Sequence, residues 1–85
     1  MWVVYLIQNS DSKQKYFGVT KNLEQRLADH NNGGIKYTTK QGSWILIYAE
    51  AYRNQADAYA RERRLKAHAR GKLELIKRLK ASLLD

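Results

Sequence analysis

The chain has 85 residues, which is enough for one small domain with a modest core and too few for a large internal cofactor cavity. Hydrophobic residues make up 44% of it and cysteine is absent, so the composition indicates a folded globular domain and excludes disulfides and thiolate metal sites. Sixteen Lys and Arg against eight Asp and Glu give a net charge of +8, which favours nucleic acid as the partner over a surface charged only for solubility.

Nothing in the sequence predicts a membrane or secretory protein. No apolar stretch is long enough to span a bilayer. The apolar start, residues 2–7, lacks the preceding basic segment and the small-residue cleavage site of a signal peptide. We therefore expect a single cytoplasmic domain over residues 1–85, without a membrane partner.

The first half of the chain predicts a hairpin followed by a helix. Residues 2–7 are apolar and rich in β-branched and aromatic side chains, which indicates a strand, and residues 15–19 give a second strand after a polar turn. Asn22 is a candidate helix N-cap, with Gln25 completing a capping box. The sequence Asn-Asn-Gly-Gly at 31–34 ends this helix, and a loop follows.

The second half predicts one more strand and two helices. Residues 44–49 form a strongly apolar strand that extends as far as Tyr52. Helical periodicity begins at Asn54 and continues to about Ala69, and Gly71 separates this helix from a last one. The expected fold is α+β in the order β-β-α-β-α-α, with a small three-stranded, mainly antiparallel sheet flanked by helices.

Several polar side chains occupy positions that face inward. Arg26 and His30 are four residues apart and share a helix face beside an apolar stripe. Glu62 lies on the inward stripe of the next helix, where a carboxylate is costly unless it is paired or holds a cation. In the hairpin, Tyr5 and Tyr16 would meet above Gly18, and a strand glycine indicates the close approach of a backbone or ligand.

These residues form a pattern that resembles the GIY-YIG nuclease family. The matching segments, in chain order, are Val3-Val4-Tyr5, Tyr16-Phe17-Gly18-Val19-Thr20, residues 22–31, Trp44 with the strand after it, and residues 60–66. The resemblance covers nearly the whole chain and is closest to the small stand-alone bacterial members, which are UPF0213-like proteins. It extends to the nuclease modules of excision-repair enzymes and of phage homing endonucleases.

The resemblance implies a metal-dependent endonuclease that hydrolyses phosphodiester bonds in DNA, with Mg²⁺ or Mn²⁺ as the cofactor. The implied catalytic residues are Tyr5, Tyr16, Arg26, His30 and Glu62, with Glu62 holding the metal. Mg²⁺ keeps most of its waters, so one carboxylate is sufficient. Arg26 would clamp the phosphate through its planar fork of donors. Tyr5 in our interpretation takes the proton from water, although Tyr16 and His30 remain alternatives for the general base.

The sequence departs from the family pattern in one respect that concerns activity. Many family nucleases carry an asparagine after the glutamate, whereas no asparagine follows Asn54 here, and His68 is the nearest substitute. The alternative function is therefore a catalytically inactive module that binds nucleic acid. The lack of an attached recognition domain predicts structure-selective action with little base readout.

Each candidate residue also has a structural interpretation. Strand tyrosines are often half-buried core residues, which is our interpretation of Tyr48, Tyr52 and Tyr59, and His30 could cap its helix. Arg26 could pair with Asp29 or Glu24, and Glu62 with Lys66. Candidate substrate contacts are Lys36, Tyr37 and Thr38. DNA is favoured over RNA, no protein partner is implied, and the chain is expected to be a monomer or a weak dimer.

Overall fold

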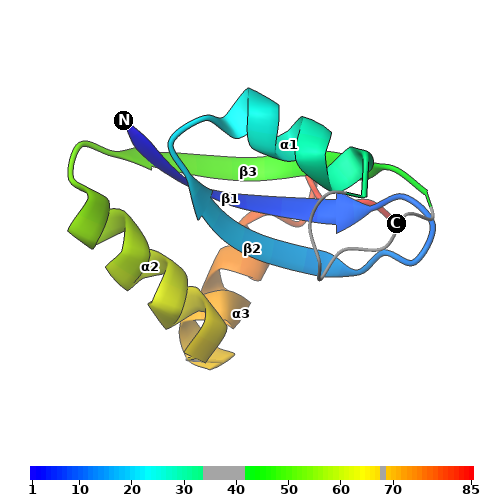
Figure 1. The fold of residues 1–85 in the computed structure, drawn as a ribbon. Coiled ribbons are helices and arrows are strands. Elements are labelled where there is room, and N and C mark those ends of the chain that lie inside the picture. The colour runs from blue at the N-terminus through cyan, green and yellow to red at the C-terminus, as the bar shows by residue number, and fades with distance from the viewer. Residues whose placement is uncertain (34–41, 68) are drawn as a thin grey trace.

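A computed structural model describes residues 1–33, 42–67 and 69–85. Its elements follow the expected order, with strands β1 (Trp2–Asn9), β2 (Lys15–Thr20) and β3 (Trp44–Tyr52) and helices α1 (Leu23–Asn31), α2 (Gln55–Ala67) and α3 (Ala69–Arg78), as Figure 1 shows. The α+β class and the β-β-α-β-α-α order predicted from the sequence are confirmed. Within the described residues, no helix is both long and apolar enough to cross a membrane.

The three strands form one antiparallel sheet in the order β2-β1-β3, so β1 is central and β2 lies at an edge. In the hairpin, Tyr5 pairs with Gly18 and Ile7 with Tyr16. Tyr5 and Ile7 are two residues apart in β1 and so point to the same face of the sheet. Tyr16 is paired with Ile7, so its side chain points to that face as well. The pairing of β1 with β3 shifts by one residue between Leu6 and Ile7.

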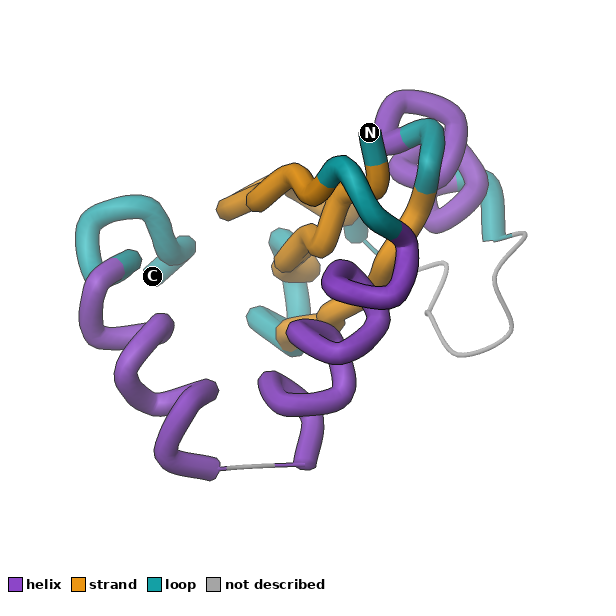
Figure 2. Tube along the Cα trace, turned by 90° about the vertical axis from the view of Figure 1, so that its left-hand side faces the viewer, coloured by secondary structure: helices purple, strands orange, loops and turns teal. Residues whose placement is uncertain are grey.

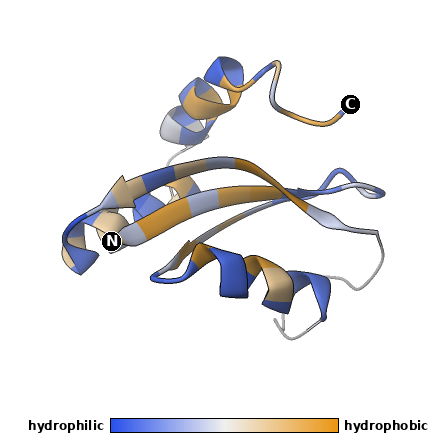
Figure 3. Cartoon of the chain, turned by 90° about the horizontal axis from the view of Figure 1, so that it is seen from above, coloured by the Kyte–Doolittle hydropathy of each residue, from blue (hydrophilic) through white to orange (hydrophobic). Residues whose placement is uncertain are grey.

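Helices cover the two faces of the sheet differently. Helix α1 lies on one face, while α2 and α3 lie on the other as a V-shaped pair that opens toward the strands (Figures 2 and 3). The first core, beneath α1, contains buried Tyr5, Ile7 and Trp44. The second core joins β1 and β2 to α2 and α3, and its buried residues are Val4, Leu6, Phe17, Val19, Ala58, Leu65, Leu75 and Leu79.

Three details of the secondary structure, and the burial of one tyrosine, differ from the expectations. Gln8 and Asn9 belong to β1 and not to the turn, and Gly71 lies inside α3 and does not precede it. The capping box is only half formed: the Asn22 side chain accepts from the Gln25 amide, but the Gln25 side chain donates to Asp29. Tyr59 is 37% exposed and contacts Trp2 at the surface, so its assignment to the core is wrong.

Candidate active site

The phenol of Tyr5 lies directly above Gly18 of the neighbouring edge strand. A Cβ atom added to Gly18 would overlap the hydroxyl and the ring of Tyr5, so this position requires glycine. The expected close approach is therefore present, and the group that approaches is the phenol of Tyr5 and not a backbone or a ligand. The Tyr5 side chain is 1% exposed, and its hydroxyl end reaches over β2 toward the edge of the sheet.

The end of α1 places an imidazole against that phenol. His30 Nε2 lies 2.8 Å from the Tyr5 hydroxyl, and the His30 ring makes edge contacts with Tyr5 and Tyr16. The next residue fixes this arrangement. Asn31 accepts from the backbone N–H of Trp44 at 2.7 Å and donates to its carbonyl at 3.2 Å, so the end of α1 is attached to the start of β3.

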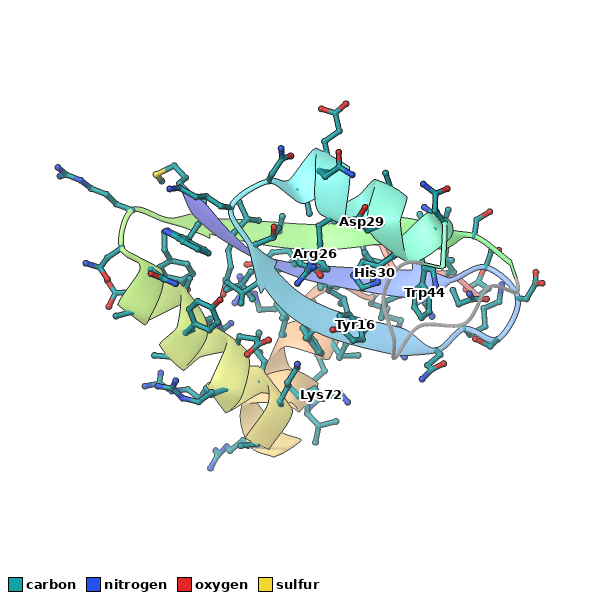
Figure 4. The ribbon with its side chains drawn as sticks, viewed as in Figure 1. Tyr16, Arg26, Asp29, His30, Trp44 and Lys72 are labelled. Atoms are coloured by element: carbon teal, nitrogen blue, oxygen red, sulfur yellow. The ribbon has the colours of Figure 1, made fainter. Side chains whose placement is uncertain are left out.

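Arg26 occupies the same side of α1, one turn before His30. Its Nε atom is buried and has no hydrogen-bond partner among the described residues. The guanidinium group acts on the Tyr5 hydroxyl through its charge and a hydrogen bond. Figure 4 shows Tyr16, Arg26 and His30 gathered beneath α1, in front of β1 and β2. The described structure records Asp29 as accepting from Gln25 and gives no ion pair between Arg26 and Asp29 or Glu24.

Helix α2 contributes the fifth candidate from the opposite face of the sheet. The Glu62 side chain is 16% exposed, and its carboxylate acts electrostatically on Tyr5. Lys66 lies one turn later, with its Nζ 3.1 Å from Glu62 Oε2 and 5.4 Å from the centre of the Tyr16 ring. Groups from both faces therefore meet around the free edge of β2, and this arrangement defines the candidate site.

The environment changes the proton affinities of the two groups in the hydrogen bond. Burial, and then the neighbouring Tyr16, raise the pKa of Tyr5 to about 12, although the charge and hydrogen bonding of Arg26 act in the opposite direction. Burial, and then the positive charge of Arg26, lower the pKa of His30. At neutral pH the phenol therefore keeps its proton and the imidazole is uncharged. The positive charge of Arg26 therefore does not make Tyr5 a phenolate at neutral pH.

All five candidates from the sequence thus lie in one place, since Tyr5 is next to His30 and interacts with Tyr16, Arg26 and Glu62. The candidate substrate contacts Lys36, Tyr37 and Thr38, and the candidate substitute His68, lie outside the described residues. Sequence reasoning missed the part played by Asn31 in holding Trp44. The four-residue spacing predicted the pairing of Lys66 with Glu62, but no pattern in the sequence predicted that Lys66 would also lie over the Tyr16 ring.

A family model described as the GIY-YIG catalytic domain matches residues 1–74 of the chain. The chain belongs to the GIY-YIG family. This membership implies a nuclease-like function, and it agrees with the resemblance found in the sequence. The candidate residues lie within the matched segment, including both hairpin tyrosines and Glu62 of α2.

The chain is also similar to small bacterial proteins of the UPF0213 group. A UPF0213 protein of Clostridium perfringens is 43% identical over 75 residues, which cover 86% of this chain and 80% of the relative. A UPF0213 protein of Staphylococcus haemolyticus is 37% identical over 75 residues, which cover 86% of this chain and 90% of the relative. The solution NMR structure of a UPF0213 protein from Bacillus halodurans has a TM-score of 0.57 at 29% identity, covering 94% of this chain and 86% of that one.

The residues present fit a divalent cation held by few protein ligands. No group of three or more His, Asp or Glu side chains gathers in the part of the chain that the structure describes. Glu62 instead offers one largely buried carboxylate beside a cationic neighbour. Mg²⁺ suits such a site because it retains waters and accepts phosphate oxygens from a substrate as further ligands.

Proposed function

We propose that this GIY-YIG domain hydrolyses phosphodiester bonds of DNA with one divalent cation, Mg²⁺ or Mn²⁺. The observation that supports this most is the convergence on the Tyr5 hydroxyl: an imidazole lies at 2.8 Å, and an arginine, a second phenol and a carboxylate all act on it. A proton acceptor, an anion-binding cation and a metal ligand are the parts that phosphodiester hydrolysis needs. A pure binding surface has no use for a largely buried carboxylate near phosphate.

The proton path in this proposal ends on His30. Water attacks phosphorus, gives its proton to the Tyr5 oxygen, and Tyr5 passes its own proton to Nε2 of His30. The raised pKa of Tyr5 and the lowered pKa of His30 support this direction, because at neutral pH the phenol is protonated and the imidazole is able to accept. We therefore assign the role of general base to His30 acting through Tyr5, in place of Tyr5 alone.

Arg26 is the group that binds the phosphate. Its guanidinium is next to the Tyr5 hydroxyl, and its buried Nε has no partner among the described residues, so a donor is available for an anionic oxygen. Leaving such a donor unsatisfied is costly, and a phosphate oxygen would satisfy it. Arg26 would thus hold the phosphate at the point where Tyr5 delivers its proton.

Glu62 would hold the cation, which when bound stabilises the charge that develops on the phosphate and on the leaving oxygen. The hydrolysis forms a P–O bond to the attacking oxygen and breaks the P–O bond to the leaving oxygen, which takes up a proton from solvent. One strand end then carries a phosphate and the other a hydroxyl. Contacts of lysine and arginine with backbone phosphates carry no sequence information, so we expect selection by DNA structure with little sequence readout.

Cleavage assays with four substrates test the proposal. Nicked, branched, single-stranded and duplex DNA are incubated with the chain in Mg²⁺, in Mn²⁺ and in chelator. We expect cleavage of at least one substrate that requires the cation, is lost in Glu62→Gln, and falls about a hundredfold or more in Arg26→Ala, as removal of a transition-state donor typically does. The matched control is Glu74→Gln, an exposed acid of α3, which should leave the rate unchanged.

Two outcomes would overturn the proposal. Equal cleavage by the wild type, by Glu62→Gln and by Arg26→Ala would show that the activity belongs to a contaminant. Binding of DNA without cleavage under every condition would identify the chain as an inactive binding module on the same fold.

A further inference from the structure

Lys66 lies between two groups of the candidate site and is not explained by the reaction described above. Its ammonium is 3.1 Å from a carboxylate oxygen of Glu62 and lies over the face of the Tyr16 ring. The Lys66 side chain is 48% exposed, whereas that of Glu62 is 16% exposed. The carboxylate is therefore held in the site, while the ammonium is free to change its partner.

A cation at Glu62 and the present position of Lys66 exclude each other. The ammonium occupies the carboxylate that a divalent ion would need, and two positive charges so close together repel. An ion pair between residues four apart on a helix is weak when one partner is half exposed, as Lys66 is, so its exchange costs little. Departure of the ammonium from Glu62 would leave a positive charge next to Tyr16, free to bind the phosphate of a substrate.

We propose that Lys66 is an exchangeable counter-cation: it neutralises Glu62 in the metal-free chain and moves to a backbone phosphate when a divalent ion takes the carboxylate. The inference depends on the proposed function in one point, that Glu62 holds the cation. Cation binding and phosphate binding are then coupled. Binding of the cation releases the Lys66 ammonium for a phosphate, and binding of the phosphate by Lys66 frees the Glu62 carboxylate for the cation.

Lys72 provides a matched control for Lys66. Its ammonium lies 6.0 Å from the ring of Phe17, the residue after Tyr16 on β2, but the structure gives it no ion pair with Glu62. Both lysines thus extend from helices toward β2 over an aromatic ring. Replacement of either by methionine keeps an unbranched apolar side chain on the ring and removes the charge.

The first test measures Mn²⁺ binding to the protein without nucleic acid, by electron paramagnetic resonance of the free ion. Removing a like charge near an ion site is expected to tighten Mn²⁺ binding in Lys66→Met by about tenfold. The affinity should change less than twofold in Lys72→Met, while Glu62→Gln should lose the site. Circular dichroism verifies that each variant is folded.

The outcomes separate the inference from the proposed function. If Mn²⁺ binding is unchanged or weaker in Lys66→Met while Glu62→Gln still loses the site, the inference about Lys66 is overturned. The cation site at Glu62 is then unaffected. Absence of any site dependent on Glu62 would overturn the cation site itself, and the inference with it.

The second test is a double-mutant cycle on duplex DNA binding in chelator, where no cleavage occurs. In the wild type, Glu62 holds the ammonium, so Lys66→Met should cost less than about twofold in affinity. In the Glu62→Gln background the ammonium is released, and the same substitution should cost about fivefold, which is the effect of one lost phosphate contact. Equal losses in the two backgrounds would overturn the transfer to phosphate.

Discussion

His30 is completely buried, and its uncharged form is the one compatible with the packing around it. Its ring contacts Tyr5, Tyr16 and Trp44, and its Nε2 shares a hydrogen bond with a phenol. Protonation would place a second positive charge near Arg26, on a side chain that has no exposed surface. The groups that keep His30 uncharged, as the proposed function requires, therefore make acid conditions unfavourable for the fold.

This argument predicts how stability depends on pH. The pKa of His30 is lower in the folded chain than its ordinary value of 6.5, so the unfolded chain binds the proton more tightly. The stabilisation is complete above pH 6.5 and is lost as the pH falls below it. Urea unfolding between pH 7.5 and 5 should show a free energy of unfolding that falls as the pH falls below 6.5, with a slope no steeper than about 1.4 kcal/mol per pH unit, the slope for one proton.

The control for this prediction is His30→Gln, which removes the titrating group. The variant is expected to be less stable at pH 7.5 but to have a flatter stability profile between pH 6.5 and 5. The lowered pKa of Glu50 affects stability only below its ordinary value of 4.5, so it does not contribute in this window. Parallel profiles for the wild type and His30→Gln would contradict the prediction.

At the scale of the secondary-structure elements, two glycines provide a matched comparison. Gly18 lies beneath the Tyr5 ring in β2, whereas a Cβ added to Gly71 in α3 would meet no atom within 4 Å. Gly18→Ala should displace the phenol, destabilise the fold by about 1–3 kcal/mol and abolish cleavage. Gly71→Ala should stabilise it by about 0.5–1 kcal/mol, because alanine is favoured in helix interiors. Thermal unfolding of both variants measures this difference in stability. Shifts of the unfolding temperature in the same direction and of similar size would contradict the prediction.

The attachment of α2 to β3 gives a second prediction. The carboxylate of Glu50 accepts from Arg61 Nε at 2.6 Å and from the hydroxyls of Tyr48 and Tyr52 at 2.8 and 3.0 Å. Because successive helical residues point about 100° apart, this network fixes the rotation of α2 that directs Glu62 toward the site. Glu50 therefore contributes to the candidate site by holding α2 in place, through hydrogen bonds to Tyr48, Tyr52 and Arg61.

Glu50→Gln cannot accept all three hydrogen bonds and should destabilise the chain by about 1–2 kcal/mol at pH 7. Cleavage activity should fall with it, because α2 is less well held. Urea unfolding measures the effect, with Glu74→Gln expected to stay within about 0.5 kcal/mol of the wild type, as surface substitutions do. Equal stability of the two variants would show that the network does not hold α2.

The sequence predicted the elements well where apolar periodicity determines them, and less well where single side chains do. The strands around Tyr5 and Trp44 were confirmed because their apolar runs are long. Asn9 was placed in a turn, since its type favours turns; in fact its side chain accepts from Asp11 and Ser12 and forms the turn while its backbone remains in β1. Gly71 was placed between helices because glycine is a poor helix former, and packing of Leu75 overrides that preference.

At the scale of the whole molecule, the site depends on contacts that no local pattern contains. Periodicity placed Arg26 and His30 on one face and Glu62 on an inward stripe, but the joining of these faces around the edge of β2 depends on the sheet order. That order puts β2 outside β1, so groups from α1 and α2, on opposite faces, reach the same edge. The family resemblance supplied this information in advance, since the motif residues come from all of these elements.

The net charge of +8 acts over the whole molecule, and under the proposed function a DNA strand would lie against exposed basic side chains. A surface hollow of about 400 Å³ on α2 is lined by Ala60, Arg63, Arg64 and Ala67. The hollow lies on the same helix as Glu62, on the face of α2 formed by these four residues. Its two guanidinium groups are exposed and flank small side chains, which leaves room for a phosphate backbone.

This position predicts a difference between two variants with equal net charge. Replacement of Arg63 and Arg64 by glutamine should lower the slope of log affinity against log salt for duplex DNA by about 2, since each phosphate contact contributes about 0.9. Replacement of the exposed Lys77 and Lys80 of the C-terminal region removes the same charge and should change the slope by less than about 0.5. Fluorescence anisotropy at several salt concentrations measures both. Equal changes in slope would mean that DNA is attracted by the total charge without a defined path over α2, and an affinity independent of salt would exclude a polyanion as the partner.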